Sequence, residues 1–108
     1  MDVEAGALMY LRLSADYMNP VVTVVGSGPT STVSLGVSDA LTRDLEAWNG
    51  RYQSIIQLSA EARRDPDSVA AIQRLDREGR ILASKIAEGV SGGSKVEYYS
   101  EGLFRLIS

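Results

Sequence analysis

The sequence has no cysteine and no histidine among its 108 residues. Without cysteine there are no disulfides and no thiol nucleophiles, and without histidine no catalytic triad that depends on an imidazole. The usual zinc sites also need one of these two residue types. Long apolar runs are missing as well: the most apolar stretch, residues 21–25, is far shorter than the roughly 20 residues that cross a bilayer. These absences exclude most familiar enzyme mechanisms and a membrane-spanning helix.

Basic residues are also few, with 11 Lys and Arg against 14 Asp and Glu and a net charge of −3. A protein that binds a phosphate backbone usually concentrates positive charge, so we expect no direct contact with nucleic acid. The chain begins Met1-Asp2-Val3-Glu4, which is acidic where a secretory signal is basic, and it has no lipidation motif. We therefore expect a cytoplasmic protein with no membrane contact.

What is present is ordinary globular composition, with 44% hydrophobic and 23% charged residues. This length and composition predict one domain over residues 1–108. Residues 7–37 follow a β pattern, and we expect three strands there, at 7–13, 21–25 and 32–37. The Asn19-Pro20 pair separates the first two strands, and the glycine-containing stretch 26–31 predicts the loop of a hairpin between the second and third.

The hydrophobic period changes from two to 3.6 at Ser38. Ser38 is a good N-cap, and Asp39 lies favourably in the first helical turn, so a helix is predicted from there to about Ala62. One face of this helix carries apolar residues spaced by three and four, namely Leu41, Leu45, Trp48, Tyr52 and Ile55.

A second helix is predicted after Asp65-Pro66-Asp67-Ser68. Its apolar stripe consists of Ile72, Leu75, Gly79, Leu82 and Ile86. Its other face carries charges of both signs and is predicted to be solvated; these residues are Arg74, Asp76, Arg77, Glu78, Arg80 and Lys85. Glycine inside a helix costs about 1 kcal/mol against alanine. We therefore interpret Gly79 as a point where a neighbouring element approaches closely.

Gly89, Gly92 and Gly93 are expected to end this helix, and residues 95–99 to form a last strand. The apolar tail, residues 101–108, fits either a further strand or a helical turn. The fold class predicted from this order is α+β: a two-layer sandwich, β-β-β-α-α-β, with both helices on one face of an antiparallel sheet. In this topology the strand after the helices runs antiparallel to the first and third strands.

No catalytic, metal-binding or cofactor-binding residue is predicted. The loop at 26–31 lacks the lysine of a phosphate-binding loop, and a strand rather than a helix follows it. The Gly-x-Ser-x-Gly pattern at 89–93 follows a helix, whereas a nucleophile elbow precedes one. The carboxylates lie on polar faces or in turns, outside apolar runs that would raise their pKa values. Arg63 and Arg64, like the arginines of the second helix, are predicted to be solvated.

Overall size, mild acidity and the order strand–strand–strand–helix–helix–strand resemble those of small immunity proteins of contact-dependent and polymorphic bacterial toxin systems. The resemblance implies a non-enzymatic protein that binds and neutralises a cognate protein toxin, often a basic nuclease. An acidic surface speeds encounter with such a partner, and tyrosines anchor protein contacts. The candidate contact residues are Asp16, Tyr17, Glu97, Tyr99 and Glu101.

Two other function classes stay open at this point. A homo-oligomeric or adaptor protein could associate through an exposed strand edge. An enzyme that relies on carboxylates would reveal itself by a buried carboxylate in a cavity. The first predicts assembly that depends on concentration, and the second is decided by the position of the acidic side chains.

Overall fold

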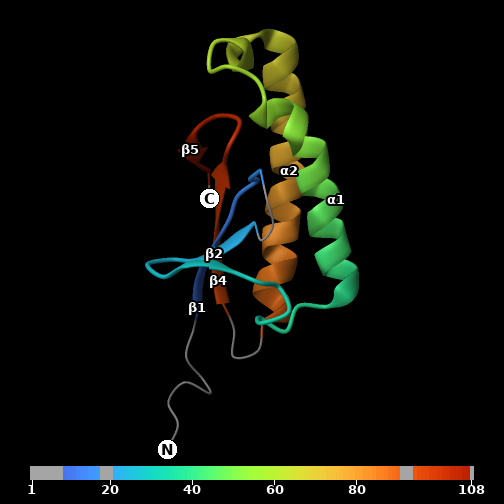
Figure 1. Ribbon diagram of the computed structural model, residues 1–108, viewed down its shortest axis with the longest axis vertical. Helices are drawn as coiled ribbons and strands as arrows, with labels where there is room; N and C mark the ends of the chain where they lie inside the picture. The colour runs from blue at the N-terminus through green and yellow to red at the C-terminus, as the bar shows by residue number, and fades with distance from the viewer. Residues whose placement is uncertain (1–8, 18–20, 91–93, 108) are drawn as a thin grey trace, which may run out of the picture.

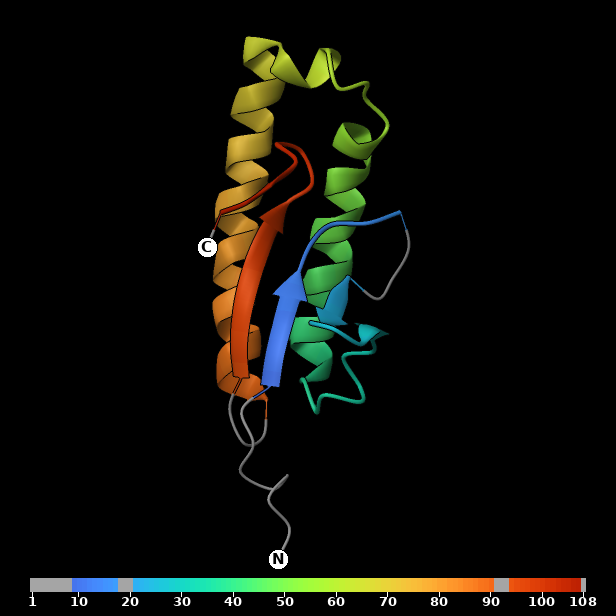
Figure 2. The same ribbon diagram turned by 90° about the vertical axis from the view of Figure 1, so that its left-hand side faces the viewer.

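The computed structural model describes residues 9–17, 21–90 and 94–107 and shows an α+β fold of two layers. Both helices cover one face of a mixed sheet, as Figures 1 and 2 show from two sides. In chain order the elements are β1 (Met9–Leu13), β2 (Val22–Val24), β3 (Gly28–Thr30), α1 (Asp39–Ile56), the 3-10 turn η2 (Ala62–Arg64), α2 (Pro66–Gly89), β4 (Ser94–Ser100) and β5 (Arg105–Leu106). The predicted fold class and the packing of helices on one face are confirmed.

The sheet is not purely antiparallel, so that part of the prediction is wrong. Its strand order is β3-β2-β1-β4-β5, and β4 runs parallel to β1 with Leu11 opposite Val96. The other strand pairs are antiparallel. Residues 31–38 carry the chain back to the end of the sheet where β1 begins, and α1 starts there (Figure 1). Because the two helices then go up and back, β4 starts beside the start of β1.

The direction of β4 differs from the prediction because the third strand does not form where it was predicted. Gly26 and Gly28 adopt φ values of +88° and +107°, so a tight turn follows β2 directly and β3 forms within the stretch predicted as loop. The stretch predicted as a strand, residues 32–37, consists of turns instead, and Gly36 has φ +75°. Leu35 and Val37 are nevertheless buried in the core.

The helices follow their predicted apolar faces. The Ser38 side chain accepts a hydrogen bond from the Leu41 N–H, which confirms the N-cap of α1. All five residues of the first stripe are buried, and in the second stripe only Leu75 is half-buried. α1 ends at Ile56, about one and a half turns before the predicted end, and Asp65 caps α2 by accepting from the Asp67 N–H.

The centre of the core is aromatic and explains Gly79. The centre of the Trp48 ring lies 5.6 Å from that of Tyr52 and 6.1 Å from that of Tyr98, between the helices and the sheet. A Cβ on Gly79 would lie 2.7 Å from Cζ2 of Trp48 and would also overlap the Tyr98 ring. The close approach predicted at this glycine is therefore confirmed.

The C-terminal segment resolves the alternative left open for the tail. β5 pairs with the end of β4, Tyr99 opposite Leu106, after a turn in which Phe104 has φ +57°. The tail is thus a short strand and not a helical turn. The start of the first predicted strand, at 7–8, and the glycines at 92 and 93 lie outside the described residues.

Candidate protein-binding surface

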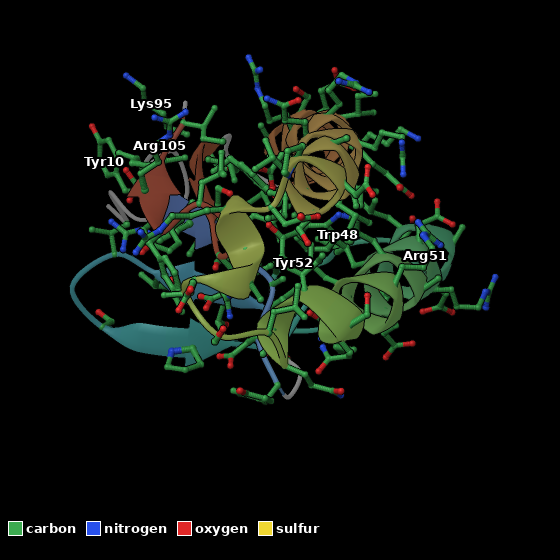
Figure 3. All side chains as sticks on the ribbon, turned by 90° about the horizontal axis from the view of Figure 1, so that it is seen from above. Tyr10, Trp48, Arg51, Tyr52, Lys95 and Arg105 are labelled. Atoms are coloured by element: carbon green, nitrogen blue, oxygen red, sulfur yellow. The ribbon has the colours of Figure 1, made fainter. Side chains whose placement is uncertain are left out.

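The face of the sheet that points away from the helices carries a mixed set of aromatic, charged and apolar side chains. Alternation along β1 and β4 places Leu11, Leu13, Val96 and Tyr98 toward the helices and their neighbours outward. We call the outward set Tyr10, Arg12, Val25, Lys95, Glu97, Tyr99 and Leu106 the open face. Figure 3 shows Tyr10 and Lys95 directed away from the helices, with Trp48 and Tyr52 between the layers.

Arg12 organises the centre of the open face. Its Nε lies 2.7 Å from Oε1 of Glu97, and its guanidinium carbon lies 5.8 Å from the centre of the Tyr99 ring. The register brings these groups together, because Arg12 is directly opposite Glu97 in the parallel pair. Glu97 is therefore paired with a cation, and this part of the surface is less acidic than its carboxylate alone indicates.

Exposed apolar side chains flank this ion pair. Tyr10 is 57% exposed, and Val25 and Leu106 are each 50% exposed. A small hollow of about 190 Å³ lies between Tyr10, Val25 and Lys95. Its volume suits one inserted side chain and is well below that of a typical small-molecule site. Apolar and tyrosine side chains around a paired charge are the composition expected of a protein contact.

Asp16, Tyr17 and Glu101 lie elsewhere, at the end of the sheet where β1 and β4 both finish. The Asp16 N–H donates to Oδ1 of Asn49 at 3.0 Å, and the Tyr17 hydroxyl donates to the Ile56 carbonyl at 3.4 Å. The structure thus divides the five predicted contact residues into two groups, with Glu97 and Tyr99 on the open face. The parallel pairing of β1 and β4 is what brings Asp16 and Glu101 to the same end.

The environment of Glu101 at this end includes a second acid and a cation. Burial raises the pKa of Glu101, and the charge of Asp16 raises it further, while Arg63 acts in the opposite direction. Arg63 Nη1 lies 3.7 Å from Oε2 of Glu101. With Tyr17 69% exposed beside these carboxylates, this end presents an acidic and aromatic surface.

Arg63 itself is buried, which contradicts the prediction of a solvated basic pair. Its guanidinium donates to three backbone carbonyls, of Ile56, Leu58 and Glu101, at 3.0, 3.2 and 2.6 Å. It also stacks on the Phe104 ring, with 4.4 Å between the guanidinium carbon and the ring centre. Arg63 thereby ties the end of α1 to the turn between β4 and β5, and it satisfies carbonyls that a longer α1 would have used.

Asp76 is the main residue that the sequence interpretation missed. The charge pattern predicts a solvated position for Asp76, but the residue is only 4% exposed. Its Oδ1 accepts hydrogen bonds from the hydroxyls of Tyr52 (2.9 Å) and Tyr98 (2.7 Å), and its Oδ2 accepts one from Ser100 (2.7 Å). The spacing contained the signal, because Asp76 lies four residues after Ile72 and three before Gly79, on the buried side of the helix.

The Asp76 cluster partly meets the condition set for an enzyme, since Asp76 also lines a hollow of about 360 Å³ beside β5. However, three hydroxyl groups already donate to its two oxygens. Burial, followed for Tyr98 by the hydrogen bond to Asp76, raises the pKa values of Tyr52 and Tyr98 far above the usual tyrosine value, so both stay neutral. We interpret the cluster as a structural connection between α1, α2 and β4.

Two further properties concern the described residues only. They contain no group of three or more histidine, cysteine or acidic side chains placed to hold a metal ion. None of their helices is long and apolar enough to cross a membrane.

Taken together, the fold and surface define a small α+β protein whose helices leave one face of the sheet open. A family profile described as Serratia CdiI immunity protein-like matches residues 9–101. The chain belongs to this family of immunity proteins. The matched region includes both helices and strands β1 to β4. Comparison with curated proteins gives no match, and comparison with solved structures gives none either.

Proposed function

We propose that this protein neutralises a cognate bacterial toxin by binding it tightly, without catalysis. The observation that carries the proposal is membership of an immunity-protein family over residues 9–101. The partner is a protein toxin, a basic nuclease being the class that the acidic chain suits best, and the encounter takes place in the cytoplasm. Neither nucleic acid nor a membrane is a partner in this proposal.

The contact surface we propose combines the open face with the acidic end of the sheet. Glu97 and Tyr99 supply the first part, where half-exposed apolar side chains surround an aromatic ring and a charge pair. Asp16, Tyr17 and Glu101 supply the second. The aromatic rings anchor the contact, and the carboxylates attract a basic partner and speed its association.

The first experiment isolates the partner and tests whether it is a toxin. The tagged protein is used to capture partners from its native cells, and each captured protein is identified and then expressed alone. We expect one stoichiometric partner that stops growth alone and is harmless when co-expressed with this protein. A partner that never impairs growth, or capture of the protein itself only, would contradict the proposal.

The contact surface is tested with a double variant, Glu97→Ala with Tyr99→Ala. We expect the dissociation constant for the captured toxin to rise at least about tenfold, because truncation of an interface aromatic commonly costs more than 1 kcal/mol. Both side chains are partly exposed, so the melting temperature should change little.

A matched control removes the Arg51–Glu78 ion pair by two alanine substitutions. This pair joins the two helices, and Figure 3 shows Arg51 on the side of the molecule opposite Tyr10. Toxin binding should be unchanged in this control. Equal affinities for the open-face variant and the control would exclude the open face as the contact, while leaving the toxin result intact.

A further inference from the structure

One edge of the sheet is only partly covered. β5 pairs with Tyr99 and Ser100 of β4, and the Ile107 N–H donates to the Tyr98 carbonyl at 2.9 Å. Among the described residues, no strand pairs with this edge of β4 from residue 94 to residue 97. Backbone groups of alternate residues point to the same side of a strand. Because the Tyr98 carbonyl faces β5, the N–H and C=O of Val96 face the uncovered edge.

A groove runs along this edge, between β4 and α2. It has a volume of about 580 Å³, and its apolar wall includes Ile81, Ala87 and Val96. Ile81 is 58% exposed, so this part of the wall is open to the side chain of a partner. An added strand would lie about 4.8 Å from β4, and its side chains would then alternate between this wall and solvent.

The groove is also positively charged, in contrast to the chain as a whole. Arg77 and Arg80 line it and also line the adjoining hollow of about 360 Å³, which Arg105 completes. No carboxylate of the described residues lies within 4.0 Å of these three guanidinium groups, since the ion pairs there involve Arg12, Arg51 and Arg63. The one acid in the two linings, Asp76, is occupied by three hydroxyl donors.

We propose that this groove binds an extended, acidic segment of a protein partner, which adds to the edge of β4 as a further strand. The free backbone groups of β4 provide the pairing, the apolar wall takes alternate side chains, and the arginines recognise carboxylates. A peptide satisfies all three features, whereas a nucleic acid satisfies only the charge. The inference rests on the proposed function for one point, that the segment belongs to the toxin.

The test uses the purified protein and a synthetic, fluorescently labelled peptide in which glutamate and valine alternate. A peptide of the same length with lysine in place of glutamate is the control for charge. We expect the acidic peptide alone to bind, as measured by fluorescence anisotropy. Reversing two charges, Arg77→Glu with Arg80→Glu, should weaken its binding by about tenfold or more.

Arg74→Glu is the matched control variant, because Arg74 is exposed on the same helix but lines neither hollow. It should bind the acidic peptide like the unchanged protein. Strand addition has a separate readout: the amide hydrogen of Val96 should exchange more slowly in the complex.

Three results with the peptides would overturn the inference. One is equal binding of the acidic and basic peptides, and another is an equal effect of the Arg74 and Arg77/Arg80 substitutions. The third is peptide binding that leaves the exchange of Val96 unchanged. Stronger binding of a single-stranded oligonucleotide at the same arginines would assign the groove to phosphate instead. The peptide assay needs no toxin. The strand-addition inference can therefore fail while the proposed function holds, and the reverse is also possible.

Discussion

Replacing Asp76 by alanine removes the one acceptor that three buried hydroxyl groups share. Tyr52, Tyr98 and Ser100 donate to its carboxylate at 2.7–2.9 Å, from α1 and from β4. Ser100 and both tyrosines are 0% exposed, so water does not readily replace the lost acceptor. The three hydroxyl hydrogens would stay buried without an acceptor, although the oxygens of Tyr52 and Ser100 still accept from the N–H groups of Gly102 and Leu103.

The expected size of the effect follows from this geometry. A buried polar group without a partner costs about 1–3 kcal/mol, and here three hydroxyl donors lose their common acceptor. We expect the free energy of unfolding to fall by about 3–5 kcal/mol, out of the 5–15 kcal/mol typical of natural domains. For a domain of this size the melting temperature should fall by about 15 °C or more.

Urea unfolding followed by Trp48 fluorescence measures this loss, because the tryptophan lies beside both tyrosines. Asp44→Ala, which removes an exposed carboxylate from α1, should change stability by less than about 0.5 kcal/mol. If Asp76→Ala does not fold, Asp76→Asn keeps one carbonyl acceptor and should show an intermediate loss. Equal stability of the Asp76→Ala and Asp44→Ala variants would refute the structural role of this carboxylate.

Two further predictions concern the same core. Burial raises the pKa values of Tyr52 and Tyr98, so above about pH 10 the unfolded chain releases two protons that the folded protein keeps. Stability is therefore fully present below pH 10 and should fall above it by up to about 2.7 kcal/mol per pH unit; equal urea midpoints near pH 9 and pH 11 would contradict this. Gly79→Ala should destabilise, because its Cβ would overlap Trp48 and Tyr98 and overpacking costs about 1–3 kcal/mol. Gly50→Ala, whose Cβ meets nothing within 4 Å, should instead stabilise by about 0.5–1 kcal/mol. Equal urea midpoints for the two variants would show that the core accommodates the added methyl group at Gly79 without cost.

Only part of the candidate binding surface can be predicted from the sequence pattern. Strand alternation correctly separates Tyr98, which is buried, from Glu97 and Tyr99, which face outward. The pairing of Glu97 with Arg12 was not predictable, because it depends on the register between two strands that are 85 residues apart in the chain. The position of Asp16 near Glu101 depends on the direction of β4, which runs parallel to β1 and not antiparallel as predicted.

Local features were determined by the sequence itself. The N-cap at Ser38 and the apolar faces of both helices depend on residues within a few turns of one another, where spacing and backbone chemistry suffice. A glycine on the apolar face of α2 also indicated the close approach at Gly79, although its partners Trp48 and Tyr98 lie on other elements. Only the tertiary structure decided the parallel pairing of β1 with β4 and the burial of Asp76 and Arg63. The turns at residues 31–38 set the strand direction. The hydroxyl donors to Asp76 lie 22 to 24 residues away, and Arg63 donates to the Glu101 carbonyl, 38 residues away, as well as to two nearer carbonyls. Compensation of that kind is a property of the assembled fold, because a charge enters the interior only where other groups satisfy it.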